Sequence, residues 1–228
     1  MAELIVALDH ADAPAAIALL DHLPDACPVK VGSVLLTRAG IGFVRGLVAG
    51  GHRVFVDAKW HDIPNTVAGA VDAAADLGVE MVTVHASGGG DMLRSAMQAA
   101  SGRIKVVAVT VLTSLDAATY AALTGRDRVV VADEVVRLAQ LAIDAGVDGV
   151  VCSAGEIARV RAVVGHRRIV VPGIRRAGDM AGDQRRIATP EAAVAAGATH
   201  LVVGRPITDA DEPGAAYREF TAAMGHEP

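Results

Sequence analysis

The sequence predicts a protein of the α/β class, folded as a single (β/α)8 TIM barrel over residues 1–228. Short runs rich in Val and Ile recur along the chain, and each precedes a longer Ala- and Leu-rich segment with helical spacing. These apolar runs are almost continuous, which indicates strands buried on both faces under helices, as in a parallel sheet. No linker or low-complexity tract divides the chain, so we expect one domain. An open, doubly wound sheet is the structural alternative.

Eight runs are interpreted as strands, and eight units of strand and helix in 228 residues fit a closed barrel. In chain order the strands are LIVALD (4–9), PVKVG (28–32), RVFVDAK (53–59), MVTVHA (81–86), IKVVAVTVL (104–112), DGVVCSA (148–154), RIVVPGI (168–174) and HLVVGR (200–205). Helices are expected at 12–23, 36–50, 66–77, 90–101, 133–145, 155–164, 189–197 and 213–224. The stretch 115–132 is the longest without a clear period, followed by the Gly-rich, charged stretch 175–186.

The composition excludes several function classes. Hydrophobic residues make up 52% of the chain and mean hydropathy is +0.40, so a sizeable core can form. Aromatic residues are only 3% and the net charge is −5, which argues against binding to nucleic acid. No apolar run approaches the roughly 18 residues of a membrane span.

Two features predict a cytoplasmic location. The N-terminus, MAELIVALDH, has no basic region before its short apolar run, so we interpret it as a first strand and not as a signal peptide. Cys27 and Cys152 lie far apart and fit no metal-ligand spacing. They are expected to be free, buried thiols in a reducing compartment.

Polar residues collect where the predicted strands end. Asp9 ends the first strand, Lys30 lies on the second, Asp57 and Lys59 on the third, and His85 on the fourth. The fifth runs into TVLTS, the seventh into PGIRR and the eighth into GRP. Because the C-terminal ends of barrel strands meet at one mouth, we predict an active site there.

The third strand places opposite charges side by side. Side chains alternate along a strand, so Asp57 and Lys59 share the face toward the barrel mouth while Val56 and Ala58 face the helices. A simple ion pair that plugs the barrel is the structural alternative. Lys30 and Asp9 on neighbouring strands favour a larger charge network, of the kind found at functional sites.

This network restricts the chemistry. An amine that forms a Schiff base must be neutral, but Asp57 and Asp62 beside Lys59 favour an ammonium ion. Lys59 is therefore predicted to donate a proton or clamp an anion. Asp57 would repel a substrate carboxylate, and loss of carbon dioxide would relieve that repulsion. The ammonium could then protonate the carbanion that remains.

The C-terminal third predicts an anion site. Barrels often bind phosphate with the loops after strands seven and eight, where this chain has PGIR and GRP. Gly173 and Gly204 allow close backbone approach, and Arg175 and Arg205 offer fork-shaped donors. Two surface arginines are the alternative. The stretch 175–186 could fold over a phosphate, with Gln184 as an uncharged donor.

The motif DAKWHDIPNT, together with VALD, KVG, VHASGG, VTVLTS, VVCSA, PGIR, GDQRRI and GRPIT in this order, resembles the bacterial orotidine 5′-phosphate decarboxylase family over essentially the whole chain. The resemblance implies a cofactor-free, metal-free homodimer that converts orotidine 5′-monophosphate to UMP and carbon dioxide. Lys59 would protonate C6 of the pyrimidine, and Asp57 would lie beside the substrate carboxylate. Lys30 would bridge the carboxylate network and a ribose hydroxyl, with Asp9 also at the ribose.

The resemblance also implies the remaining contacts. Asp62 and Thr66 would reach across the dimer interface into the partner's site, and Thr113 and Ser114 would face the base. The phosphate would be held by Arg175, Gln184, Gly204 and Arg205. His61 stays unassigned. His85 is interpreted as a hydrogen-bonded support of the rim more readily than as an acid or base.

Two other functions remain as alternatives. Metal-dependent sugar-phosphate decarboxylases and synthases of the same barrel group carry a Glu at the position of Lys30 and lack the IPNT segment. A cation at that position would oppose a metal ion. A catalytically silent nucleotide-binding barrel is the second alternative, but it would have no use for the charges at Lys30, Asp57, Lys59 and Asp62.

Overall fold

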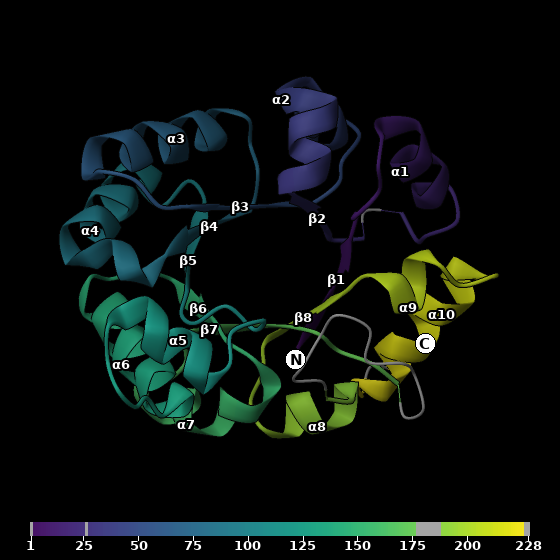
Figure 1. Cartoon of the computed structure of the whole chain (residues 1–228). Coiled ribbons are helices and arrows are strands. Elements are labelled where there is room, and N and C mark those ends of the chain that lie inside the picture. Colours follow the sequence, from purple (N-terminus) through teal and green to yellow (C-terminus); the bar gives the residue numbers. More distant parts are fainter. Residues whose placement is uncertain (1, 26, 177–187, 226–228) are drawn as a thin grey trace.

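The eight strands form a closed parallel barrel in the order in which they follow along the chain. The structure is a computed structural model that describes residues 2–25, 27–176 and 188–225. Figure 1 looks down the barrel, with the helices in a ring around the strands. The barrel closes where β1 pairs with β8, from Glu3 opposite His200 to Val6 opposite Val203. The predicted fold class is confirmed, and the open sheet is excluded.

Each strand overlaps the run predicted for it. The strands are β1 (Glu3–Ala7), β2 (Val29–Gly32), β3 (Val54–Trp60), β4 (Met81–His85), β5 (Lys105–Val109), β6 (Gly149–Val151), β7 (Arg168–Pro172) and β8 (His200–Val203). The helices are α1 (Ala13–Leu20), α2 (Ser33–Ala49), α3 (Pro64–Asp76), α4 (Gly89–Ala100), α5 (Ala117–Thr124), α6 (Val131–Asp144), α7 (Ile157–Val164), α8 (Pro190–Ala195), α9 (Arg205–Thr208) and α10 (Pro213–Ala223). Single 3₁₀ turns, η1 (Ala86–Gly88) and η2 (Ala154–Glu156), follow β4 and β6.

Helix α5 lies in the stretch where no helix was predicted. Its sequence, AATYAALT, places apolar residues on every side, so it shows no helical period. Its ends carry the signal instead. The Asp116 side chain accepts the N–H of Thr119 at 2.9 Å, and Gly125 ends the helix in the left-handed conformation with φ of 64°. Capping therefore predicts this helix better than periodicity does.

The core has two parts, one between barrel and helices and one inside the barrel. The inner part is a layer of seven buried apolar side chains: Ile5, Ala7, Phe55, Met81, Val107, Val170 and Val202. Toward the C-terminal ends of the strands the interior becomes polar, with Lys30 and Thr83 buried and Asp57 nearly so. The apolar layer is thus the floor of a polar mouth.

Two other predictions concern features outside the mouth. Cys27 and Cys152 are both buried, and neither forms a disulfide within the described part of the chain, as expected. Among the described residues, no helix has the length and apolar character needed to cross a membrane.

Candidate active site

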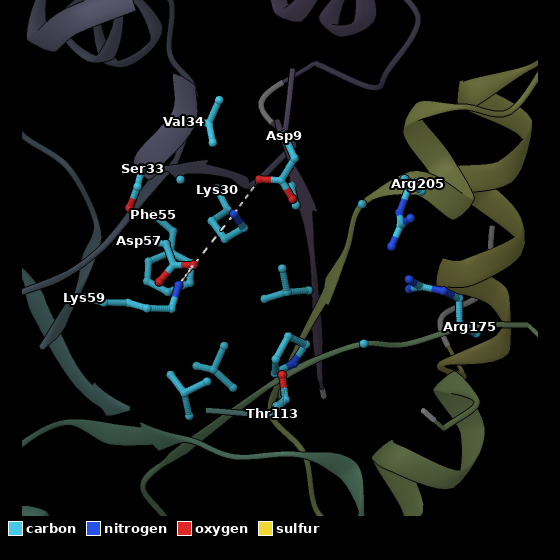
Figure 2. Close-up of a pocket in the computed structure, with 18 residues that line it drawn as sticks. Asp9, Lys30, Ser33, Val34, Phe55, Asp57, Lys59, Thr113, Arg175 and Arg205 are labelled. Atoms are coloured by element: carbon cyan, nitrogen blue, oxygen red, sulfur yellow. Dashed lines mark hydrogen bonds and ion pairs between the residues drawn. The ribbon is translucent and has the colours of Figure 1, made fainter. Parts of the chain in front are cut away.

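A cavity of about 580 Å³ opens at the C-terminal ends of the strands. Figure 2 shows its lining side chains. The predicted site residues that line it are Asp9, Lys30, Asp57, Lys59, Thr113, Arg175, Gly204 and Arg205. The structure therefore brings residues from six strand ends and their loops to one cavity, as the sequence predicted.

Lys30 and Lys59 bracket the carboxylate of Asp57. The Lys59 Nζ lies 2.8 Å from Asp57 Oδ2. The Lys30 Nζ lies 2.9 Å from Asp9 Oδ1 and 3.7 Å from the same Asp57 oxygen. The side chain of Asp57 is 13% exposed and that of Lys30 10%, whereas that of Lys59 is 38% exposed. The Lys30–Asp57 pair is therefore anchored in the barrel, whereas Lys59 and, at 62% exposed, Asp9 are open to a ligand.

An irregularity in β3 sets the direction of Lys59. Val56 pairs with Val82 and Trp60 with Val84, so β3 has two more residues than β4 over this interval. Lys59 adopts a left-handed backbone with φ of 53°, which is uncommon for a residue other than Gly. Its N–H donates to Thr83 Oγ1 at 2.8 Å.

The surroundings of Asp57 keep it ionised. Burial by itself raises the pKa of a carboxyl group, but the charges of Lys30 and Lys59 and hydrogen bonds from Lys59 and Thr83 oppose that effect. The net result is a pKa for Asp57 below its ordinary value of 3.8. A fixed anion thus lies beside an ammonium group in the cavity at neutral pH.

Two guanidinium groups lie across the cavity from this network, as Figure 2 shows. Arg175 follows β7 and is buried, and its Nη1 donates to the carbonyl of Ile174 at 2.8 Å. Arg205 follows Gly204 at the start of α9. Among the lining residues, four cations face two carboxylates. The cavity therefore suits a ligand with a multiply charged anion at one end.

Three predicted residues lie beside the cavity. Ser114 is exposed and is not part of the lining. Asp62 and Thr66 are exposed and line a smaller hollow of about 280 Å³, where Asp62 Oδ1 accepts the N–H of Ile63 at 2.6 Å. Lys59 lines both hollows, so the surface with Asp62 and Thr66 adjoins the main cavity. Gln184 lies outside the described residues.

His85 stands near the network without lining the cavity. Its ring centroid lies 5.3 Å from that of His61. Burial lowers the pKa of His85, and the neighbouring His61 and Lys59 lower it further, against an opposing effect of Asp57. A neutral imidazole is therefore favoured.

Sequence analysis did not identify several lining residues, among them Gly32, Ser33, Val34, Phe55 and Pro172. Phe55 precedes Asp57 by two and so faces inward by strand alternation, a signal that could have found it. Ser33 and Val34 directly follow a strand end, which is also a usable signal. Thr83, which holds Asp57 and Lys59 but is absent from the lining, was missed as well.

The sequence model of the Orotidine 5'-phosphate decarboxylase / HUMPS family matches residues 2–220. The chain belongs to this family. It is 56% identical to the orotidine 5'-phosphate decarboxylase of Halorhodospira halophila, over 97% of this chain and 95% of that protein. It is 49% identical to the protein of that name from Chromobacterium violaceum, over 94% and 88% of the two chains.

A solved structure supports the same assignment. The crystal structure of orotidine 5'-phosphate decarboxylase from Lactobacillus acidophilus superposes with a TM-score of 0.89 at 35% identity, covering 99% of this chain and 100% of that one. The family description names both orotidine 5'-phosphate decarboxylase and HUMPS, and both of these relatives are named orotidine 5'-phosphate decarboxylase. Within the described part of the chain, no three His, Cys, Asp or Glu side chains are grouped so that they could hold a metal ion.

Proposed function

We propose that this member of the orotidine 5'-phosphate decarboxylase family converts orotidine 5′-monophosphate to UMP and carbon dioxide, as one domain over residues 1–228. The observation that supports this most directly is the Lys30–Asp57–Lys59 network facing Arg175 and Arg205 across one cavity. A nucleotide has a phosphate at one end and, in this substrate, a carboxylated ring at the other. The two charged sides of the cavity match these two ends.

The phosphate end binds at Arg175, Gly204 and Arg205, with Gln184 assigned from the sequence alone. Lys30 bridges the carboxylate network and a ribose hydroxyl, and Asp9, which lies 2.9 Å from Lys30 Nζ, also contacts the ribose. Thr113 and Ser114 contact the base. Binding energy from phosphate and ribose, which do not react, holds the pyrimidine against the charge network.

The reacting end works by electrostatics. Asp57 lies beside the substrate carboxylate and repels it, and this repulsion is lost as carbon dioxide departs. The electron pair of the broken bond stays on C6, and the ammonium of Lys59 delivers a proton there. The resulting amine regains a proton from water. Because the C6 carbanion has no ordinary resonance stabilisation, preorganised charges must supply much of the rate enhancement. The chemistry needs no cofactor.

The active form is a homodimer in this proposal. Asp62, Ile63 and Thr66 lie at the start of α3, and Ile63 is 67% exposed, so this surface is available for contact. Asp62 of the partner subunit would extend the alternation of Lys30, Asp57 and Lys59, and Thr66 would contact the partner's ligand. The two buried cysteines, which form no disulfide within the described residues, suit a reducing cytoplasm.

The ultraviolet absorbance of orotidine 5′-monophosphate tests the proposal. Purified protein with excess EDTA should remove the orotate chromophore and form UMP, while a Lys59→Ala preparation, made in the same way, controls for contaminating host enzyme. Turnover only after magnesium is added would instead indicate the metal-dependent sugar-phosphate group. No turnover under either condition, with tight UMP binding, would indicate a silent nucleotide-binding barrel.

A further inference from the structure

Thr83 is a fully buried polar residue inside the barrel. It lies on β4 two residues after Met81, and Met81 belongs to the apolar floor of the mouth. The apolar side chains of Val82 and Val84, on either side of Thr83, face the outer core instead. A hydroxyl at such a depth is costly unless it is hydrogen-bonded, so its partners indicate what it does.

The partners of Thr83 belong to the two central residues of the charge network. Its Oγ1 lies 2.8 Å from the backbone N of Lys59 and 3.0 Å from Asp57 Oδ1. An amide N–H can only donate and a carboxylate can only accept. The hydroxyl therefore accepts from Lys59 and donates to Asp57, and its proton has one possible direction.

The two contacts restrict different motions. The bond to the amide holds Lys59 in its left-handed conformation, at the point where β3 departs from regular pairing with β4. The bond to Oδ1 fixes the rotation of the Asp57 carboxylate, whose other oxygen contacts the Lys59 ammonium at 2.8 Å. One hydroxyl thus fixes the backbone of the lysine and the plane of the carboxylate.

We propose that Thr83 is a positioning residue for the reaction, whose hydroxyl holds Asp57 and Lys59 in the geometry in which one stresses the substrate and the other protonates it. This inference rests on the roles of Asp57 and Lys59 given under the proposed function. Thr83 does not line the cavity and so acts only through these two residues. Catalytic groups held by preorganised contacts need no rearrangement during the reaction, which is why losing such a contact lowers the rate.

The test replaces the hydroxyl while keeping the shape. Thr83→Val should lower kcat by about 10- to 100-fold, the range expected for a hydrogen bond to a charged group, with KM changed much less. Thr83→Ser retains the hydroxyl and should recover most of the activity. If the valine variant fails to fold, Thr83→Ala is measured in its place.

Thr199→Val is the matched control. Thr199 is a partly buried threonine whose Oγ1, like that of Thr83, hydrogen-bonds a backbone N–H, that of Ile169 at 2.9 Å. It precedes β8 at the opposite end of the barrel. The Thr199→Val variant should lose stability and keep the wild-type kcat.

The pH profile of Thr83→Val is a second readout. Because the Thr83 hydrogen bond lowers the pKa of Asp57, the acid limb of kcat/KM should move to higher pH in Thr83→Val.

Two results would overturn the inference: wild-type kcat in Thr83→Val, or equal losses in the valine and serine variants. The second result would mean that the side-chain shape matters and the hydroxyl does not.

Asp57→Asn and Lys59→Ala are assayed beside the Thr83 variants. If these two variants keep wild-type turnover, the proposed function itself fails. If they lose turnover while Thr83→Val keeps it, only the role of Thr83 is wrong.

Discussion

The ammonium group of Lys30 occupies the space above Gly32. A Cβ atom at Gly32 would lie 2.9 Å from Lys30 Nζ and 3.3 Å from Asp9 Oδ1, the carboxylate oxygen to which Lys30 donates. Gly32 also pairs in register with Asp57. The absence of a side chain at Gly32 is therefore what allows Lys30 to extend between Asp9 and Asp57.

Gly32→Ala should lower activity with little effect on stability. The new methyl group contacts the end of the flexible Lys30 side chain, which can move away at little cost in folding free energy. This movement takes the ammonium out of its position between the carboxylates of Asp9 and Asp57. We expect kcat/KM to fall roughly tenfold or more, as for a weakened charge-assisted hydrogen bond. Steady-state kinetics and thermal unfolding measure the two effects. Gly42→Ala in α2, with open space around its Cβ position, should keep full activity. Wild-type kinetics in Gly32→Ala would contradict the packing argument.

Lys59→Ala should abolish turnover while UMP still binds, because the phosphate and ribose contacts remain. A general acid typically contributes about 10²- to 10⁴-fold, so the fall in kcat should be at least of that order. Lys59 has φ of 53°, which disfavours alanine, and Lys59→Gly separates backbone strain from loss of the amine. Both variants should be inactive and both should bind UMP by calorimetry. Near wild-type turnover in either one would refute the proton-donor assignment.

Arg205→Ala should weaken use of the phosphorylated substrate. Loss of a charged hydrogen bond costs about 1.5–3 kcal/mol, so kcat/KM should fall roughly 10- to 100-fold. Turnover of orotidine, the nucleoside without phosphate, should be slow and equal in wild type and variant. Arg176→Ala is the control, since Arg176 Nη1 pairs with Glu219 Oε2 at 2.8 Å. If kcat/KM for the nucleotide stays unchanged in Arg205→Ala, the phosphate binds elsewhere.

Acid should remove the stabilisation that comes from Asp57. Its pKa in the folded protein lies below the ordinary 3.8, so the stabilising effect of the ionised carboxylate is complete above that value and disappears as the pH falls through the folded pKa. Urea unfolding of wild type and Asp57→Asn at about pH 6 and about pH 3 measures this difference. The stability advantage of wild type should be larger at the higher pH. An advantage that grows on acidification would contradict the direction of the shift.

Mixed dimers test whether Asp62 works in the partner's site. A hybrid of Lys59→Ala and Asp62→Ala subunits would contain one site with both changes and one intact site. Equal mixing with subunit exchange should therefore restore about a quarter of wild-type activity from two impaired proteins. Gel filtration of each protein alone measures whether it is a dimer. If the mixture is no more active than its components, Asp62 acts within its own chain or not at all.

Much of the site was predictable because barrel geometry turns sequence position into spatial position. Lys30, Asp57 and Lys59 lie at strand ends, and the ends of eight parallel strands must meet, so their convergence follows once the fold is known. Arg175 and Arg205 follow for the same reason. Helix α5 was missed because its signal lies in the capping residues Asp116 and Gly125 and not in a hydrophobic period. Ser33 and Val34, which line the cavity, follow a strand end and take part in no strand alternation.

The sequence by itself determined the strand order, the cavity end of the barrel and the types of charge placed there, since these depend on alternation and on residue identity. Only the tertiary structure decided how the charges are held. In the sequence, Thr83 is a single polar residue in an apolar run and has no distinguishing feature. Its role depends on the irregular pairing of β3 with β4, which places the Lys59 amide within hydrogen-bond distance of the Thr83 hydroxyl. In the same way, nothing in the sequence distinguishes Gly32 from the other glycines. Its role depends on the position of the Lys30 ammonium, which lies against it. The roles of Thr83 and Gly32 depend on distances between atoms of neighbouring strands. Hydrophobic periodicity and local propensity give no information about such distances.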